Sequence, residues 1–172
     1  IKPAGGPLSQ EELGALEHTL SRNYYLDGGE IQYRQLERKI IFEEFIGDPP
    51  AVPPDFKVSC FQGQTLFCSL ILDRYEEQNQ VWLDRGGNRL PMYLESPWMR
   101  KTVRSYEGHV DLPSTYPSII SSAETLSRGF RFCRVDLFTH QDEVIFGEFT
   151  FSPNNLLNIH CPHRFNLVET WL

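Results

Sequence analysis

The sequence has no excess of basic residues and no long apolar run. Its 172 residues carry a net charge of −7 at pH 7, which argues against a nucleic-acid partner because phosphate backbones select basic surfaces. The longest apolar run, Leu66–Leu72, is interrupted by Ser69 and is far shorter than the roughly 20 residues that span a bilayer. We therefore expect no membrane span and read this run as a buried strand.

Several chemical signatures are also missing. No serine has a GxSxG context, so a hydrolase nucleophile elbow is not supported. The run His160-Cys161-Pro162-His163 matches no usual zinc spacing. The four cysteines form no CxxC pair and lie in or near apolar segments: Cys60, Cys68, Cys133 and Cys161. We expect them to be reduced, buried thiols of a cytoplasmic protein.

What the sequence does have is enough apolar material for a core. Hydrophobic residues make up 40% of the chain and aromatic residues 13%, which excludes a disordered chain. No internal repeat, low-complexity tract or obvious linker interrupts it. The length suits one domain, so we predict a single domain over residues 1–172.

The first part of the chain predicts helices followed by a strand. Ser9 and Glu12 form a capping-box pattern, and leucines at helical spacing follow, so we predict a helix over Gln10–Arg22. A second short helical stretch is expected around Tyr33 and Leu36. The run Lys39–Phe45 is short and apolar, which predicts a strand.

The rest of the chain predicts two β-hairpins and one helix. Phe56–Gln62 and Gln64–Arg74 are expected to form the first hairpin, and Phe130–Thr139 and Glu143–Phe151 the second. Tyr75–Pro117 shows no clear period, so we expect irregular structure with short strands. A helix after Pro117 is predicted to end at Gly129, and its buried face is predicted to hold Ile119, Ile120, Ala123, Leu126 and Phe130. The sum is an α+β fold of antiparallel hairpins with flanking helices.

The second hairpin carries the strongest chemical signal. Strand alternation places Arg134 and Asp136 on one face, and Glu148 and Thr150 share a face on the partner strand. If Asp136 and Glu148 pair across the hairpin, two carboxylates meet beside an arginine, an arrangement that suits Mg²⁺ and substrate phosphates. The alternative is that Arg134 simply forms an ion pair with Asp136 or Glu148 on a solvated sheet face.

Two weaker features point to nucleotide chemistry. Glu43, Glu44 and the apolar residues beside them could offer backbone groups to adenine and a carboxylate to ribose, or they could be an exposed edge strand. Lys2 precedes the loop that contains Gly5 and Gly6, and glycine loops of this type can cradle phosphates with a lysine as a point charge. Each pattern is weak by itself.

Together these features resemble the TupA-like ATP-grasp family. The matching stretches are Ile1–Pro3, KIIFEEFIG at 39–47, DFKVSCFQ at 55–62 with Asp73-Arg74, and FRFCRVDLFTHQDEVIFGEFTFSP at 130–153. The last stretch is the most specific, because RVDL and GE-x-TF occur at hairpin spacing. The resemblance implies an ATP-grasp fold, in which ATP lies between two α+β lobes and a carboxylate is activated as an acyl phosphate.

The resemblance also implies roles for individual residues. Asp136 and Glu148 correspond to the Mg²⁺ ligands, and Arg134 to the catalytic arginine. The implied ATP contacts are Lys2 for phosphate, Glu43, Glu44, Phe45 and Ile46 for adenine, Asp55 for ribose, and Lys57 and Arg74 for phosphate or substrate. The implied partners are a nucleotide and a carboxylate or sugar-linked substrate. This branch of the family is associated with joining acidic units in cell-surface polysaccharides.

Three departures from the general ATP-grasp pattern leave alternatives open. Thr150 stands where many ATP-grasp enzymes carry an asparagine metal ligand, with Asn154 or Asn155 as substitutes. The loop after Lys2 is AGGPLS, which is poorer in serine and glycine than a tight phosphate clamp. The lobe expected before the lysine strand is not represented, so we expect a fragment or a reduced relative. A ligase is the first hypothesis; a degenerate nucleotide-binding module and a kinase of the same fold are the alternatives.

Overall fold

The computed structural model describes residues 7–27, 31–47, 52–72, 79–96, 101–151 and 159–160. The chain divides into two compact units, Ile1–Ala51 and Val52–Leu172. The described elements of the first unit are helical, and those of the second are eight strands and one helix. The single domain predicted over residues 1–172 stays a prediction.

The first unit begins with the helix that the capping box predicts. Helix α1 spans Gln10–Ser21. The backbone N–H of Glu12 donates to the Ser9 hydroxyl at 3.2 Å, and the Ser9 N–H donates to the Glu12 carboxylate at 2.6 Å. At the other end, Arg38 donates to the carbonyls of Leu20 and Ser21, which the last turn of a helix leaves without partners. Helix α2 (Tyr24–Asp27) and the 3₁₀ helix η1 (Ile31–Gln35) follow.

The strand predicted over Lys39–Phe45 is wrong. Residues 37–46 contain no helix or strand, and the side chains of Ile41 and Phe42 are 76% and 75% exposed. A strand requires a neighbour for its backbone hydrogen bonds, and no described strand of this chain pairs with the segment. A short apolar run therefore did not specify a strand by itself.

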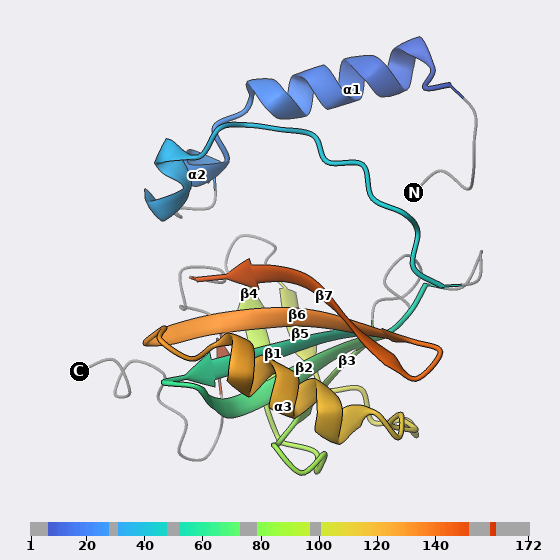
Figure 1. The fold of residues 1–172 in the computed structure, drawn as a ribbon, viewed down its shortest axis with the longest axis vertical. Coiled ribbons are helices and arrows are strands. Elements are labelled where there is room, and N and C mark those ends of the chain that lie inside the picture. The colour runs from blue at the N-terminus through green and yellow to red at the C-terminus, as the bar shows by residue number, and fades with distance from the viewer. Residues whose placement is uncertain are drawn as a thin grey trace. The chain divides into compact units, whose positions relative to one another are not determined.

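The second unit contains a five-stranded antiparallel sheet in the order β3-β2-β1-β6-β7 (Figure 1). Its strands are β1 (Asp55–Phe61), β2 (Gln64–Leu72), β3 (Asn79–Leu83), β6 (Phe132–His140) and β7 (Glu143–Thr150). Strands β1–β2 and β6–β7 are the two predicted hairpins. Pairing of β1 with β6 joins the hairpins in the middle of the sheet.

The predicted irregular middle of the chain holds short strands, as expected. Besides β3, it forms β4 (Tyr93–Ser96) and β5 (Lys101–Arg104). These two strands pair with each other, and β4 also pairs with β8 (Ile159–His160), which gives a three-stranded sheet. Residues 161–172, which follow β8, lie outside the described residues.

Helix α3 (Tyr116–Leu126) covers one face of the five-stranded sheet (Figure 1). Ile119, Ile120 and Ala123 are buried there, as predicted. They pack against one face of the strands, which contributes Phe56, Val58, Cys60, Cys68, Leu70, Val81, Leu83, Cys133, Val135 and Leu137. The hydrophobic core of the unit therefore lies between α3 and the sheet.

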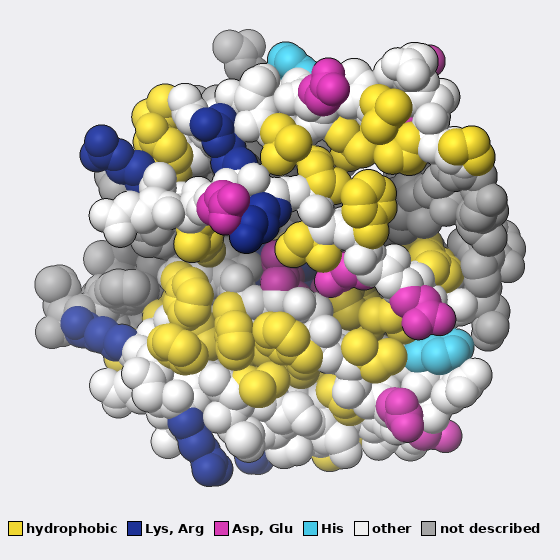
Figure 2. Space-filling model, turned by 45° about the horizontal axis from the view of Figure 1, so that its top comes forward, with side chains coloured by type: hydrophobic (Ala, Val, Ile, Leu, Met, Phe, Trp, Pro, Cys, Tyr) yellow, Lys and Arg dark blue, Asp and Glu magenta, His cyan; other side chains and the backbone are white. Residues whose placement is uncertain are grey.

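The predicted buried face of this helix extends too far. The helix ends at Leu126, before Gly129, and Leu126 and Phe130 are 38% and 40% exposed. Apolar residues at helical spacing continue in the sequence past Leu126, where the helix ends and a turn begins. Phe130 instead contacts Phe149 and Phe151, with ring centroids 5.8 and 5.1 Å apart. Hydrophobic side chains also gather on part of the molecular face that Figure 2 draws.

Three of the four cysteines are buried free thiols, as predicted: Cys60, Cys68 and Cys133. Burial raises the pKa of each thiol, that of Cys133 to about 11, so they stay protonated at neutral pH and act as small apolar side chains. Cys161 lies outside the described residues. No helix within the described ranges combines the length and the apolar character that crossing a bilayer requires.

Replacing Ile119 by alanine should lower the free energy of unfolding by about 2–5 kcal/mol, because it empties a fully buried site. The matched change Leu126→Ala, on the same helix, should cost less than about 1 kcal/mol because that side chain is partly exposed. Urea denaturation measures both. Equal losses would contradict the helix face described above.

Candidate functional site

The face of the five-stranded sheet opposite α3, here called the site face, carries charged side chains. Alternation along β1 turns Asp55, Lys57 and Ser59 away from the apolar residues that contact α3. Alternation along β6 does the same for Arg134 and Asp136. Two neighbouring strands therefore direct charged groups of both signs to one place.

The strand register brings these groups into rows across the sheet. Asp136 pairs with Glu148 on β7, so the condition considered for the second hairpin is met, and it pairs with Lys57 on β1. In the next row Arg134 lies between Ser59 and Thr150. The charged cluster is defined by Asp55, Lys57, Arg134, Asp136 and Glu148.

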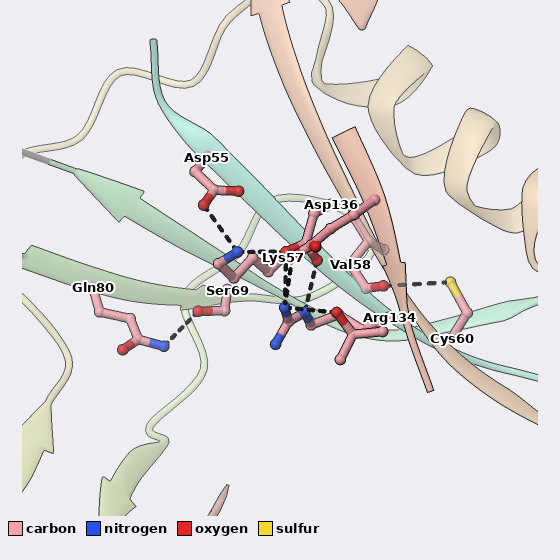
Figure 3. Close-up of polar contacts among 10 residues, drawn as sticks. Asp55, Lys57, Val58, Cys60, Ser69, Gln80, Arg134 and Asp136 are labelled. Carbon is pink, nitrogen blue, oxygen red and sulfur yellow. Dashed lines mark hydrogen bonds and ion pairs between the residues drawn. The ribbon is translucent and has the colours of Figure 1, made fainter. Parts of the chain in front are cut away.

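Asp136 is the centre of the charged cluster (Figure 3). It is 2% exposed, and both of its oxygens accept charge-assisted hydrogen bonds. Arg134 Nε donates to Oδ1 at 2.6 Å, and Arg134 Nη2 donates to Oδ2 at 2.8 Å. Lys57 Nζ lies 2.5 Å from the same Oδ2. A buried carboxylate with two cationic partners is electrostatically satisfied in this state.

The same two cations contact the other members of the cluster. Lys57 Nζ lies 2.9 Å from Oδ2 of Asp55, which is also 2% exposed. Arg134 Nη2 donates to the Thr150 hydroxyl at 2.9 Å and lies 3.8 Å from Glu148 Oε1. The guanidinium is thus held from two strands, whereas the lysine is held by two carboxylates.

The ionisation of the cluster follows from these contacts. Burial lowers the pKa of Arg134, but the hydrogen bonds and charge of Asp136 outweigh it, so the pKa is raised overall and the guanidinium stays charged. The pKa of Glu148 is raised, first by partial burial and then by the negative charge of Asp136. Since the Glu148 side chain is 66% exposed, a cation from solvent can reach it and relieve this repulsion.

A β-bulge at Gly147 sets the position of Glu148. Glu148 pairs with Asp136 and Phe146 with Leu137, so Gly147 has no partner in the register. The extra residue lets Phe146 face α3 while Glu148 lies on the site face. A Cβ on Gly147 would lie 2.8 Å from a Phe138 ring carbon and 3.1 Å from the Asp136 carbonyl oxygen. Only glycine fits there, which explains the glycine before the glutamate.

Not all of the predicted site residues can be placed in this cluster. Glu43, Glu44, Phe45 and Ile46 belong to the first unit, where both glutamates are exposed and the two apolar residues are partly buried. Their contact with adenine stays a prediction. Lys2 and Arg74 lie outside the described residues, as do Asn154 and Asn155.

Sequence reasoning did not assign Ser69 and Gln80, which also lie on the site face. Ser69 pairs with Lys57 in the register and accepts a hydrogen bond from the Gln80 side chain. The available signal was the single polar residue within the apolar run 66–72. The β1–β6 pairing, which brings Lys57 to Asp136, was also not predicted.

The cluster contains the oxygen ligands that Mg²⁺ prefers. Within the described ranges, no set of three or more histidine, cysteine, aspartate or glutamate side chains is placed to hold a metal ion. Mg²⁺, however, is commonly bound through one or two carboxylates together with substrate phosphates and water. Asp136 and Glu148, adjacent in the register, fit that smaller requirement.

Comparison with known proteins identified one family. The model of the family described as TupA-like ATPgrasp matches residues 11–168. A search of curated proteins and a search of solved structures each gave no match.

Replacing Asp136 by alanine should lower the free energy of unfolding by roughly 3–5 kcal/mol, because it leaves Lys57 and Arg134 partly buried without their shared counter-charge. Glu148→Ala should cost less than about 1 kcal/mol, because its side chain is mostly exposed. Denaturant titration without metal measures both variants. Similar losses would show that Asp136 is not the centre of the cluster.

Proposed function

Because this chain belongs to the TupA-like ATP-grasp family, we propose that it is an ATP- and Mg²⁺-dependent carboxylate ligase. The observation that carries the proposal is the charged cluster, in which two carboxylates for a metal adjoin two cations for phosphate. The proposed reaction activates a carboxylate as an acyl phosphate, which an amine or other nucleophile then attacks. The product is an amide or an ester.

The carboxylates have the role of holding the metal. Asp136 and Glu148 bind Mg²⁺ from adjacent strands, and the bulge at Gly147 keeps both on one face. When bound, Mg²⁺ neutralises charge on the ATP phosphates. Partial exposure of Glu148 gives the ion a route from solvent.

Arg134 has the role of stabilising the transferred phosphoryl group. Its Nε and Nη2 groups donate to Asp136 and Thr150, which fixes the guanidinium. No hydrogen bond from Nη1 to another described residue is recorded, so we propose that Nη1 donates to the incoming oxygen. A fixed donor is useful because it need not reorganise when charge develops. Arg134 is therefore the proposed catalytic residue.

The remaining nucleotide contacts follow the family pattern. Glu43, Glu44, Phe45 and Ile46 are proposed to bind adenine. Lys2 is proposed to contact phosphate, and Arg74 phosphate or substrate. Asp55 was expected at the ribose; its ion pair with Lys57 supports a further role in positioning that lysine. These are proposals about roles, made from the family and from the geometry of the cluster.

The proposals for the substrate and the cellular compartment also follow from the family. We infer that the chain joins acidic units for a cell-surface polysaccharide, with a carboxylate or sugar-linked substrate. ATP consumption and free buried thiols both fit the cytoplasm.

A nucleotide-binding module without turnover is the second candidate. Thr150 stands at the place of a third metal ligand in many ATP-grasp enzymes, and here its hydroxyl accepts a hydrogen bond from Arg134. Among the described residues, the proposed metal ligands are then the carboxylates of Asp136 and Glu148, without a third side chain beside them. This observation favours the second candidate over a kinase, although the same fold supports phosphoryl transfer.

Calorimetric titration of ATP into the full chain, with and without Mg²⁺, tests the proposed site. We expect saturable binding that Mg²⁺ strengthens. Glu148→Gln should remove most of that strengthening, at least tenfold or about 1.4 kcal/mol, while leaving the fold intact. ATP binding that is indifferent to Mg²⁺ and to Glu148→Gln would overturn the metal assignment.

Product analysis then separates the candidate reactions. With ATP and candidate carboxylates and amines, a ligase releases phosphate and forms an amide or ester. A kinase instead leaves a phosphorylated acceptor. Binding of ATP with no formation of ADP identifies the degenerate module.

A further inference from the structure

The charged cluster contains an internal cation at the proposed metal ligand. Lys57 Nζ lies 2.5 Å from Asp136 Oδ2, the oxygen that also accepts from Arg134 Nη2. The side chain of Asp136 is only 3% exposed, so little room is left for a third cation. A divalent ion at this carboxylate and an ammonium on the same oxygen would repel each other.

Of the two cations, Lys57 is the one that can leave. Arg134 makes two hydrogen bonds to Asp136 and a third to Thr150, in the fixed geometry of a planar guanidinium. Lys57 makes one contact to Asp136 and one to Asp55. Its ammonium is a compact charge on a flexible stem, and its side chain is 17% exposed.

We propose that Lys57 is a resident counter-ion that Mg²⁺ displaces from Asp136, and that Lys57 then turns to the ATP phosphates while Asp55 holds it near. This proposal rests on the metal site of the proposed function. It makes Lys57 a positioning residue in the free protein and a phosphate contact in the complex.

The net charge of the cluster predicts when Mg²⁺ replaces Lys57 at Asp136. The cluster has three carboxylates and two cations without metal, so it is close to neutral. Addition of Mg²⁺ alone leaves an excess of positive charge, and addition of ATP phosphates offsets that excess. We therefore expect metal alone to bind weakly, and metal and ATP to strengthen each other's binding.

The experiment compares Mn²⁺ binding to the full chain with and without the lysine charge, in the absence of nucleotide. Lys57→Met, which keeps the stem, should bind Mn²⁺ at least tenfold more tightly than the native chain. It should bind ATP in the presence of Mg²⁺ at least tenfold more weakly. The matched control Arg85→Met removes an exposed cation that pairs with Glu124 and should leave Mn²⁺ affinity unchanged.

A measurement on the native chain covers the case in which Lys57→Met does not fold. Lysine acetylation followed by peptide mass spectrometry reports how accessible each ammonium is. Mg²⁺ without nucleotide should raise the rate at Lys57 several-fold and leave exposed Lys39 unchanged. An unchanged rate at Lys57, with Mg²⁺ bound, overturns the exchange.

The outcomes separate this inference from the proposed function. If the native chain binds Mn²⁺ and Lys57→Met binds it equally or more weakly, the exchange is wrong and the metal site stands. If neither protein binds Mn²⁺, the metal site fails and the exchange fails with it. Tighter binding by Lys57→Met supports both.

Discussion

Pairing of β1 with β6 is the contact on which the second unit depends. Each hairpin is held by its own turn, but among the described strands only this ladder joins the two into one sheet. On one face it completes the floor beneath α3, where Val58 and Val135 meet. On the other face it places Lys57 against Asp136. The core and the charged cluster are therefore two sides of the same strand pairing.

The position of Glu148 depends on a more local constraint. The bulge at Gly147 changes which side of β7 faces α3, so that Phe146 and Glu148, two residues apart, lie on opposite faces. An unbulged strand would place both on the same face. The carboxylate then reaches the site face without removing an aromatic side chain from the α3 side. A glycine at position 147 is therefore as necessary to the charged cluster as the charged residues are.

The sequence predicted structure well where neighbouring residues determine it. The capping box at Ser9 and both hairpins depend on short separations, and these predictions were confirmed. The pairing of Asp136 with Glu148, which the sequence analysis considered as a condition, is also present. The contact of Lys57 with Asp136, 79 residues apart, depends on which strands become neighbours, and no local pattern specifies that. The strand predicted at Lys39–Phe45 was wrong because a strand needs a neighbouring strand for its backbone hydrogen bonds, and a local pattern does not specify that neighbour. The family resemblance supplied Lys57 and Asp55 as site residues, but the structure was needed to bring them to Asp136.

Alternation along β1 has a consequence for how this sheet tolerates sequence change during evolution. Phe56, Val58 and Cys60 face the core, where a substitution is accepted or rejected according to its volume. At Asp55 and Lys57, which alternate with these core residues, a substitution is accepted or rejected according to its charge. Lys57 balances the buried carboxylates of Asp55 and Asp136, and Asp55 balances the partly buried Lys57. Substitutions in β1 are thus accepted or rejected by side-chain volume at one set of alternate positions and by charge at the other. A change on the charged side becomes acceptable when a compensating change arises on β6, so the two strands are expected to evolve as a pair.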